Sequence, residues 1–394
     1  MVDRGGTTQR CARVLAGAML VLVVSGCTVA SRSATSSSGA SESSAPSGAV
    51  TTSPSASVEP GVMWARASRL PVVREYSVVV AVAPMGEGFV AFSIDGEGVQ
   101  NTDLWHSPDG RTWESVAPRG DPVYGVVGVV AVGGRLLAFG NIGGITEIRA
   151  AFWTSEDGVT WRRAQADFDG AQVIDVAAGD DGFVAVGGAI WTSTSGETWT
   201  RVTDSGQFEG AFLWAITRGG PGFVAVGWRP NPEPDLAVWT SVNGREWALA
   251  PDPPGGQGFE GRDVVEREGM LVMVGDRVGS GTAAGAWTST DGVTWRPAEA
   301  SASFEGSAMV TVTATPSGLL AVGSRNVDDA GVWTSSDGRA WEPLDDSVFV
   351  DAFLTDATVA VGVVVLVGAT QERIAGSASY TSAAMAWYGE VEQR

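Results

Sequence analysis

The sequence predicts an all-β protein, a seven-bladed β-propeller with four antiparallel strands per blade. Three observations support this fold class. A tryptophan-rich box of nine residues occurs six times, and a short apolar run bounded by glycine occurs seven times. The 394 residues also include 53 glycines and 16 tryptophans, which suits a β-rich protein with many tight turns. The boxes recur at intervals of about 40 to 50 residues, the spacing typical of propeller blades and other arrayed modules.

Each box predicts a β-hairpin. Threonine and tryptophan residues flank the turn, and both types favour strands. A short polar residue followed by glycine forms the turn in every copy, as a turn with positive φ requires. The six polar residues are Asp109, Asp157, Ser195, Asn243, Asp291 and Asp337. Because Ser195 and Asn243 replace the acid, we expect the box acids to be structural and not catalytic or metal-binding.

The glycine-bounded apolar runs, such as Gly182–Gly187, are typical of strands buried on both faces. They number seven, one more than the complete boxes. After the last run comes Trp387, which matches the strand before a box turn but lacks the strand that should follow. Trp64, near the start of the repeats, has the sequence context of that missing strand. We therefore expect the N-terminal strand to close the last blade, so that residues 59–394 form one ring.

Residues 1–27 have the features of an export signal. A basic segment precedes the apolar run Val14–Val24, which is too short for a membrane-spanning helix. The run ends in Val-Ser-Gly-Cys, which resembles the lipobox of bacterial lipoproteins. That resemblance implies cleavage before Cys27 and a palmitate-containing lipid on its thiol. We expect the mature protein to be extracytoplasmic, lipid-anchored to the bacterial cell membrane and without a second cysteine, because Cys11 lies in the removed segment.

Residues 28–58 are rich in serine and poor in large apolar side chains, so this segment is predicted to be a disordered tether. The formal net charge is -20, and all 25 basic residues are arginine. Nucleic acid is therefore an unfavourable partner, because its phosphates require a basic surface. No cofactor motif occurs, and the single histidine excludes a histidine-rich metal site. We expect a monomer.

The boxes resemble the Asp-box (BNR) repeats of the sialidase-like propeller superfamily, whose pattern is Ser/Thr-x-Asp-x-Gly-x-Thr-Trp. Aligned from Thr154, the acid falls one place late, at Asp157 instead of Glu156, which predicts a turn one residue tighter than in the family. The resemblance implies a propeller with the boxes at its periphery. It therefore predicts the fold and says little about catalysis.

The resemblance also raises an exo-sialidase hypothesis. Such enzymes use three arginines to hold the substrate carboxylate, a tyrosine nucleophile activated by a glutamate, and an aspartate acid/base. Arg74 lies near the expected first arginine, but the Phe-Arg-Ile-Pro motif around it is absent. Tyr380, in an expected late loop, is the tyrosine that best fits a nucleophile. The innermost strands are mainly apolar, which disfavours a convergent catalytic set.

A second repeated motif precedes the innermost strand of four consecutive blades. It combines an aromatic residue, an acid and a glycine. The copies are Phe168-Asp169-Gly170, Phe208-Glu209-Gly210, Phe259-Glu260-Gly261 and Phe304-Glu305-Gly306. One interpretation is structural, with phenylalanine packed between blades and the acid capping a turn. The other is an arc formed by Asp169, Glu209, Glu260 and Glu305 that faces a cationic ligand, a divalent metal or a basic partner.

Three longer connections, residues 93–103, 228–236 and 369–383, belong to the same face, and recognition is often placed on such loops. Trp228 and Arg229 offer an aromatic ring and a cation there. The sequence thus favours a binding or scaffold module for a glycan, peptide or protein partner. A sialidase-type glycoside hydrolase is the alternative.

Overall fold

The structure is a computed structural model of the 394-residue chain. It describes residues 64–390 apart from short gaps at 68–69, 71–75, 96–100, 144–146, 166–167, 169, 204–207, 232, 278–281, 326–328, 345–346 and 374–379. The predicted signal segment with Cys27 and the predicted tether lie outside the described residues, and so do Arg74 and Asp169. Among the described residues, no helix is both long enough and apolar enough to cross a membrane.

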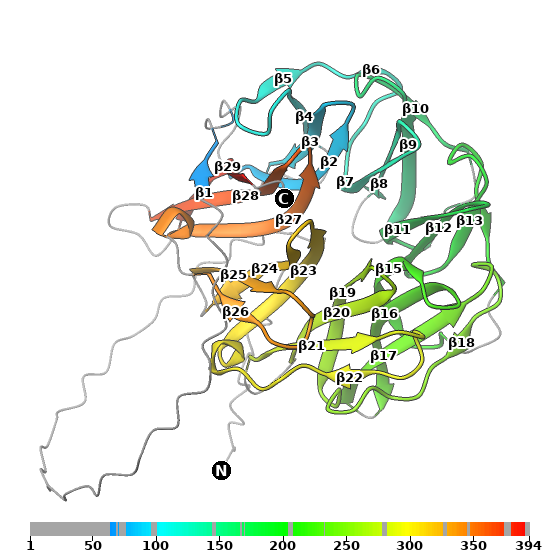
Figure 1. Ribbon diagram of the computed structural model, residues 1–394. Coiled ribbons are helices and arrows are strands. Elements are labelled where there is room, and N and C mark those ends of the chain that lie inside the picture. Colours follow the sequence, from blue (N-terminus) through cyan, green and yellow to red (C-terminus); the bar gives the residue numbers. More distant parts are fainter. Residues whose placement is uncertain are drawn as a thin grey trace, which may run out of the picture.

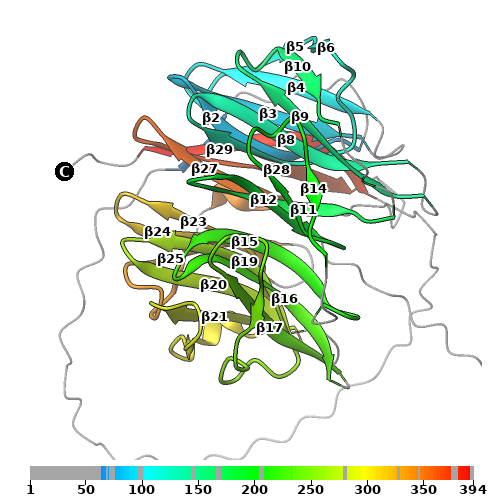
Figure 2. The same cartoon turned by 90° about the vertical axis from the view of Figure 1, so that its right-hand side faces the viewer.

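Seven sheets follow one another around a central axis and form a seven-bladed β-propeller, as predicted (Figure 1). Within each blade the strands run antiparallel from the innermost to the outermost, and we call these positions A to D. Neighbouring sheets pack face against face; for example β11 and β12 pack against β15 (Figure 2). We number the blades 1 to 7 in the order of their A strands.

The A strands are β2 (Val78–Met85), β7 (Val126–Val132), β11 (Val173–Gly179), β15 (Phe212–Gly219), β19 (Phe259–Arg267), β23 (Ser307–Thr315) and β27 (Ala352–Ala360). The B strands are β3 (Gly88–Ile94), β8 (Arg135–Ile142), β12 (Gly182–Gly187), β16 (Gly222–Asn231), β20 (Met270–Arg277), β24 (Gly318–Arg325) and β28 (Val363–Arg373).

The C strands are β4 (Thr102–Ser107), β9 (Arg149–Ser155), β13 (Trp191–Ser193), β17 (Glu233–Ser241), β21 (Ala284–Ser289), β25 (Asp329–Ser335) and β29 (Tyr380–Glu390). The D strands are β5 (Glu114–Val116), β10 (Thr160–Arg163), β14 (Thr200–Arg201), β18 (Ala248–Leu249), β22 (Arg296–Pro297), β26 (Glu342–Pro343) and β1 (Trp64–Arg66). In blade 2 a further strand, β6 (Arg119–Gly120), pairs in parallel with β10. Two short 3-10 helices, η1 (Ala302–Phe304) and η2 (Ser347–Phe349), precede blades 6 and 7.

Blade 7 is completed by the N-terminal strand, which confirms the predicted closure. β1 pairs antiparallel with β29, and Arg66 lies opposite Trp387 in the register. The Trp64 side chain is buried, and its ring meets the edge of Phe349 at 5.6 Å between centroids. Residues from the two ends of the ring therefore share one sheet and one apolar core.

The box turns are held by side-chain oxygens, as blade 5 illustrates. The Asp291 carboxylate accepts hydrogen bonds from the backbone N–H groups of Val293 at 2.9 Å and Thr294 at 2.7 Å. The Trp295 indole N–H donates to the carbonyl oxygen of Gly292 at 3.1 Å, and the same tryptophan–glycine bond occurs in all six boxes. The box acids are therefore turn-forming groups in the structure.

A serine just before each turn supplies a contact that the alignment from Thr154 did not identify. Ser289 Oγ accepts from the buried N–H of Gly292 at 2.9 Å, and Ser155 Oγ accepts from Gly158 at 2.9 Å. The working pattern is thus Ser-x-Asp-Gly-x-x-Trp, with the acid directly before the glycine. It explains the one-residue offset, because the turn starts at the serine and not at Thr154.

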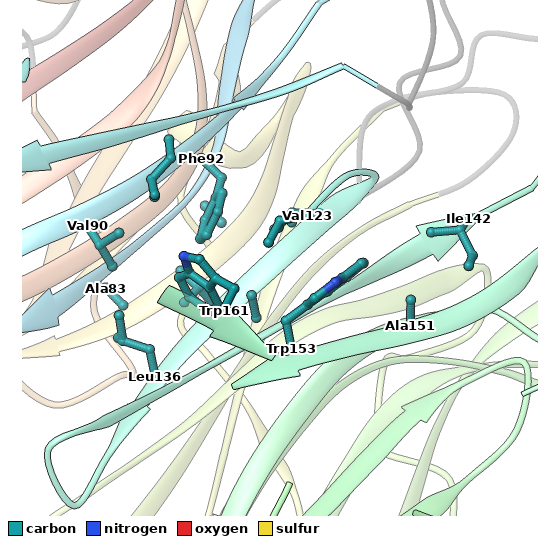
Figure 3. Close-up of a cluster of buried hydrophobic side chains, with 14 residues drawn as sticks. Ala83, Val90, Phe92, Val123, Leu136, Ile142, Ala151, Trp153 and Trp161 are labelled. Carbon is teal, nitrogen blue, oxygen red and sulfur yellow. The ribbon is translucent and has the colours of Figure 1, made fainter. Parts of the chain in front are cut away.

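The box glycines also fix the distance between blades. Gly292 has φ +72°, and a Cβ added there would lie 2.8 Å from Val224 of the preceding blade. Each box thus presses against its neighbour where only glycine fits. Neighbouring blades also pack buried side chains against each other. Between blades 1 and 2, for example, the ring centroids of Phe92 and Trp161 are 5.3 Å apart (Figure 3).

Candidate functional site

The box turns and the A-to-B turns lie on one face of the ring. The opposite face carries the D-to-A connections and the B-to-C hairpins, and we call it the mouth face. In blades 4 and 7 the strands extend far into the segments that the sequence suggested were loops. Trp228 and Arg229 belong to β16, and Tyr380 is the first residue of β29, opposite Arg373. Paired strands therefore make up most of the described part of these two segments.

Each of the seven A strands contains a β-bulge near the mouth face. The register with strand B skips one residue in every blade, and that residue is left without a cross-strand partner. In blade order the skipped residues are Val80, Val127, Ile174, Trp214, Arg262, Val310 and Thr355. The ring thus provides seven copies of the same position, which can be compared directly.

Blades 4 and 5 depart from the others at this position. Five blades carry an aliphatic residue or threonine at the bulge, whereas blade 4 has Trp214 and blade 5 has Arg262. Two residues earlier, blade 4 has Phe212 and blade 5 has Glu260. The residues at that earlier position in the remaining blades are Val78, Gly125, Gln172, Ala308 and Phe353. The charged pair Glu260 and Arg262 is therefore an exception within the repeat.

Trp214, Glu260, Arg262 and Asp276 form a bonded group, which we call the mouth quartet. Arg262 Nη1 forms an ion pair with Glu260 Oε2 at 3.0 Å, and Arg262 Nε donates a hydrogen bond to the Asp276 carboxylate. The Trp214 indole N–H donates to the same Glu260 oxygen at 3.0 Å. The Arg262 guanidinium also lies over the Trp214 ring, 4.7 Å from its centroid. The quartet thus joins blade 4 to blade 5.

The charges of the quartet are removed from water. Glu260 is 7% exposed and Asp276 is 3% exposed. The two carboxylates also stand directly opposite each other on β19 and β20, an unfavourable arrangement for like charges that Arg262 bridges. Burial raises the pKa of Glu260; Arg262 opposes this rise and Asp276 adds to it. The group therefore holds two buried acids against one buried base.

Aromatic side chains extend from the quartet along blade 4. The Phe212 and Trp214 rings lie 4.7 Å apart between centroids, and Phe212 is paired across the strands with Trp228. All three side chains are half-buried. Arg229 follows Trp228 and forms an ion pair with the exposed Asp252 at 2.7 Å. Aromatic surface with a few fixed polar groups is the composition of many ligand sites.

A second set of acids faces the axis directly after the bulge. Asp175, Asp263 and Asp356 each accept a hydrogen bond from the A strand of the following blade. The donors are the N–H groups of Ile216 at 2.8 Å, Val312 at 2.8 Å and Val82 at 2.9 Å, respectively. Each aspartate also accepts from the N–H that follows it in its own strand. These three clasps connect blades 3 and 4, 5 and 6, and 7 and 1.

The clasp carboxyls are held in surroundings that disfavour charge. Desolvation raises the pKa of Asp263 to about 8, that of Asp356 to about 7 and that of Asp175 to about 6. The charge of Asp175 adds to the rise at both other aspartates. Among the described residues, no group of three or more His, Cys, Asp or Glu side chains is placed to hold a metal ion.

The structure separates the acids of the repeated aromatic–acid–glycine motif. Glu209 and Glu305 are exposed on their connections, whereas Glu260 lies inside β19 within the mouth quartet. The aromatic residues of the motif pack inside the blades, as shown by Phe259, whose ring meets Trp287 at 5.3 Å. Of the acids of the predicted arc that the structure describes, Glu260 alone joins a buried cluster.

Sequence reasoning missed Trp214, Arg262 and Asp276. The available signal was the polarity of blade 5's A strand, where Glu260, Arg262 and Asp263 interrupt a strand that is apolar in most other blades. The bulge that brings Arg262 next to Glu260 has no local sequence signature. Trp214 was the other signal, because it belongs to neither tryptophan position of a box.

No protein-family model matches the chain, and no curated protein matches it in sequence. Solved structures of Trypanosoma rangeli sialidase are similar to it. The sialidase in complex with the inhibitor DANA is 13% identical, with a TM-score of 0.46, over 81% of this chain and 55% of that chain. The complex with sialic acid is 12% identical, with a TM-score of 0.47, over 84% of this chain and 59% of that chain. The chain thus spans less than two thirds of the length of these sialidases.

Proposed function

We propose that this protein is a binding module whose propeller recognises a glycan, peptide or protein partner on the mouth face, at the junction of blades 4 and 5. The observation that carries the proposal is the break in the repeat. Seven blades share one bulge, and at its two compared positions only blade 5 carries charged side chains, which join the mouth quartet. Positions that break a local rule without a gain in packing are expected where function is placed.

Stability gives no reason for the quartet. Removing charged groups from water costs several kcal/mol per ion, and well-packed apolar residues often stabilise a protein as well or better than a buried ion pair. The equivalent positions of blade 6, Ala308 and Val310, show the apolar solution within the same chain. The half-buried rings of Phe212 and Trp228 beside the quartet supply the contact area that a ligand needs.

Matched truncations at the bulge test this proposal. Wild type, Trp214→Ala and Val310→Ala are each applied to an array of glycans and peptides. Val310 occupies the same bulge position in blade 6, so its truncation controls for general loosening of the ring. We expect Trp214→Ala to lose at least tenfold in affinity for every ligand that binds wild type, and Val310→Ala to lose less than twofold. Equal effects of the two variants would place the binding site elsewhere.

The second candidate is a sialidase-type glycoside hydrolase. Its support is the similarity of the boxes to the Asp-box repeats. The Arg262 side chain at the mouth face is 9% exposed, and its charge is paired with Glu260 and Asp276. That pairing leaves it poorly suited to hold a substrate carboxylate. A fluorogenic sialoside assay decides between the candidates, because turnover above that of a heat-denatured sample would favour the hydrolase.

We further propose that the propeller is tethered by residues 28–58 to a lipid on Cys27 at the outer face of the cell membrane. The lipobox-like sequence and the serine-rich segment after it support this location. Metabolic labelling with a palmitate analogue tests it. Label is expected on wild type and absent from Cys27→Ser, while an unlabelled wild-type protein in the soluble fraction would contradict the anchor.

A further inference from the structure

The mouth quartet has an unbalanced charge. Glu260 and Asp276 contribute two negative charges, and Arg262 contributes one positive charge. Buried charges in proteins are normally paired with an opposite charge or neutralised. Arg277, the next residue on β20, is exposed and lies over the Phe259 ring at 4.7 Å. Its charge is therefore screened by water and does not restore the balance inside the quartet.

The unused hydrogen-bonding capacity is concentrated on one atom. Both Asp276 oxygens accept hydrogen bonds from Arg262, and Glu260 Oε2 accepts from Trp214 and is ion-paired with Arg262. Within the described part of the chain, no group donates to Glu260 Oε1. Glu260 is 7% exposed as a residue, and the oxygen that keeps contact with solvent is Oε1. This oxygen is therefore within reach of a ligand at the mouth face. A bound group that donates a hydrogen bond would satisfy it.

The chemistry of the missing group follows from its surroundings. A divalent metal needs several oxygen ligands, whereas this site offers a single free carboxylate oxygen. An ammonium or guanidinium group can donate to one carboxylate oxygen while its other N–H groups stay hydrated, and it gains further from nearby aromatic rings, tryptophan above all. The half-buried rings of Trp214, Phe212 and Trp228 lie along the same side of blade 4.

We propose that the mouth quartet binds a cationic side chain, the lysine or arginine of a peptide or protein partner, with Glu260 Oε1 as its acceptor and the blade 4 aromatic rings as its walls. The proposal rests on the binding function assigned to this junction and specifies its ligand. The exposed Glu209, on the connection that leads into blade 4, adds a favourable field for the approach of a basic partner. The overall charge of -20 acts in the same direction.

Fluorescence polarisation with paired peptides tests the proposal. The probes are labelled octapeptides that carry one central lysine or arginine and otherwise identical peptides with glutamine at that place. We expect the basic peptides to bind wild type about tenfold more tightly, corresponding to about 1.4 kcal/mol. The preference should weaken as salt rises from 50 to 300 mM, because the interaction is between charges. A neutral glucan oligosaccharide serves as the uncharged ligand.

Two charge-matched variants identify the acceptor. Glu260→Gln is expected to abolish the preference for basic peptides, while Glu246→Gln, which removes the same charge from an exposed box position, should keep it. Trp228→Ala, a half-buried surface position, reports on the aromatic wall if Glu260→Gln folds poorly. This substitution should lower the affinity for the basic peptides at least threefold.

The possible results separate this inference from the binding function itself. Equal binding of lysine and glutamine peptides would overturn the cationic ligand, and so would a preference that survives Glu260→Gln or no peptide binding up to millimolar concentration. Binding of the neutral glucan that is insensitive to salt but lost in Trp214→Ala would overturn the cationic ligand and leave the binding function intact. If no variant at this junction changes any binding, both proposals fail.

Discussion

The Asp263 carboxylate of blade 5 accepts a hydrogen bond from the backbone N–H of Val312 in blade 6 at 2.8 Å. Two further aspartates make the same connection at other junctions of the ring. The bond places a carboxyl group among the innermost strands of the ring. It connects two blades, but it removes the aspartate from water. This balance makes the stability of the propeller depend on pH.

The first prediction concerns that pH dependence. The pKa of Asp263 is raised to about 8, so its neutral form is favoured in the folded state. Stability from this shift is fully present below the unfolded value near pH 4 and is lost as pH rises through 8. We expect the unfolding free energy and the melting temperature of wild type to fall between pH 5 and pH 9. The fall in unfolding free energy of Asp263→Asn should be smaller than that of wild type by about 1 to 3 kcal/mol. Differential scanning calorimetry measures both.

The control for this prediction is Asp181→Asn, which changes the net charge by the same amount at an exposed position. Its pH profile should follow that of wild type. Parallel profiles for all three proteins would show that the clasp does not titrate in this range.

The second prediction concerns the box turns. Ser289→Ala removes the acceptor of the buried Gly292 N–H and should cost about 1 to 3 kcal/mol of unfolding free energy. Asp291→Asn should cost less than 1 kcal/mol, because Asn243 already fills this role in blade 4 with bonds of 2.9 and 3.0 Å. Chemical denaturation compares the two, and a more damaging Asp291→Asn would contradict the assignment.

The box acids also make the stability of the protein depend on pH below about pH 4. Two N–H donors lower the pKa of Asp291 to about 2, so its stabilising contribution is present above pH 4 and is lost as pH falls towards 2. Any stability difference between wild type and Asp291→Asn should therefore shrink over this range. A difference that is constant from pH 5 to pH 2 would show that the charge of Asp291 does not matter to the turn.

The third prediction concerns the closure of the ring. Trp64→Ala removes a ring that is 8% exposed and packed against Phe349, so it should cost about 3 to 5 kcal/mol. Trp228→Ala, at a half-buried hairpin position, should cost less than half as much. Limited proteolysis should cut the first variant faster and release fragments from blade 7. Equal protease resistance of the two variants would argue against β1 as the closing strand.

The fourth prediction separates stability from function at the mouth quartet. Arg262→Met alone leaves two buried carboxylates without their base and should cost about 3 to 5 kcal/mol. The triple replacement Glu260→Ala, Arg262→Val and Asp276→Ser installs the residues that blade 6 has at the same register positions. It should melt at or above the wild-type temperature while losing ligand binding. A triple variant less stable than Arg262→Met would show that the quartet serves packing.

The ring could be predicted because its signals are local and repeated. The repeated turn residues and apolar B strands indicated seven blades. In the last blade Trp387 had no following strand in the sequence, and the strand that contains Trp64 fills that place. The mouth quartet could not be predicted in the same way. Arg262 meets Trp214 across a blade junction, 48 residues away in sequence, through a bulge that leaves no mark in composition. Long-range side-chain geometry, unlike a turn, is not encoded in a short segment.

The two long hairpins show the same limit. Segments that vary in length between repeats suggested loops, but β16 and β17 stay paired from Phe223–Ser241 out to Asn231–Glu233. Cross-strand pairing overrides composition here, since even Pro230 and Pro234 lie opposite each other in the ladder. A strand needs a partner, and sequence alone does not show where one is available.

The sharing of blade 7 between β1 and β29 sets an order of events during biosynthesis. Six blades can form as the polypeptide emerges, but the first strand has no partner until residues 380–390 have been made and delivered. A chain interrupted before that point would leave an open ring in which Trp64 and the hydrogen-bonding edge of β28 have no partner strand. Such a product would expose apolar surface and an unpaired strand edge to proteases and chaperones, so the ring is protected only once residues 380–390 are in place.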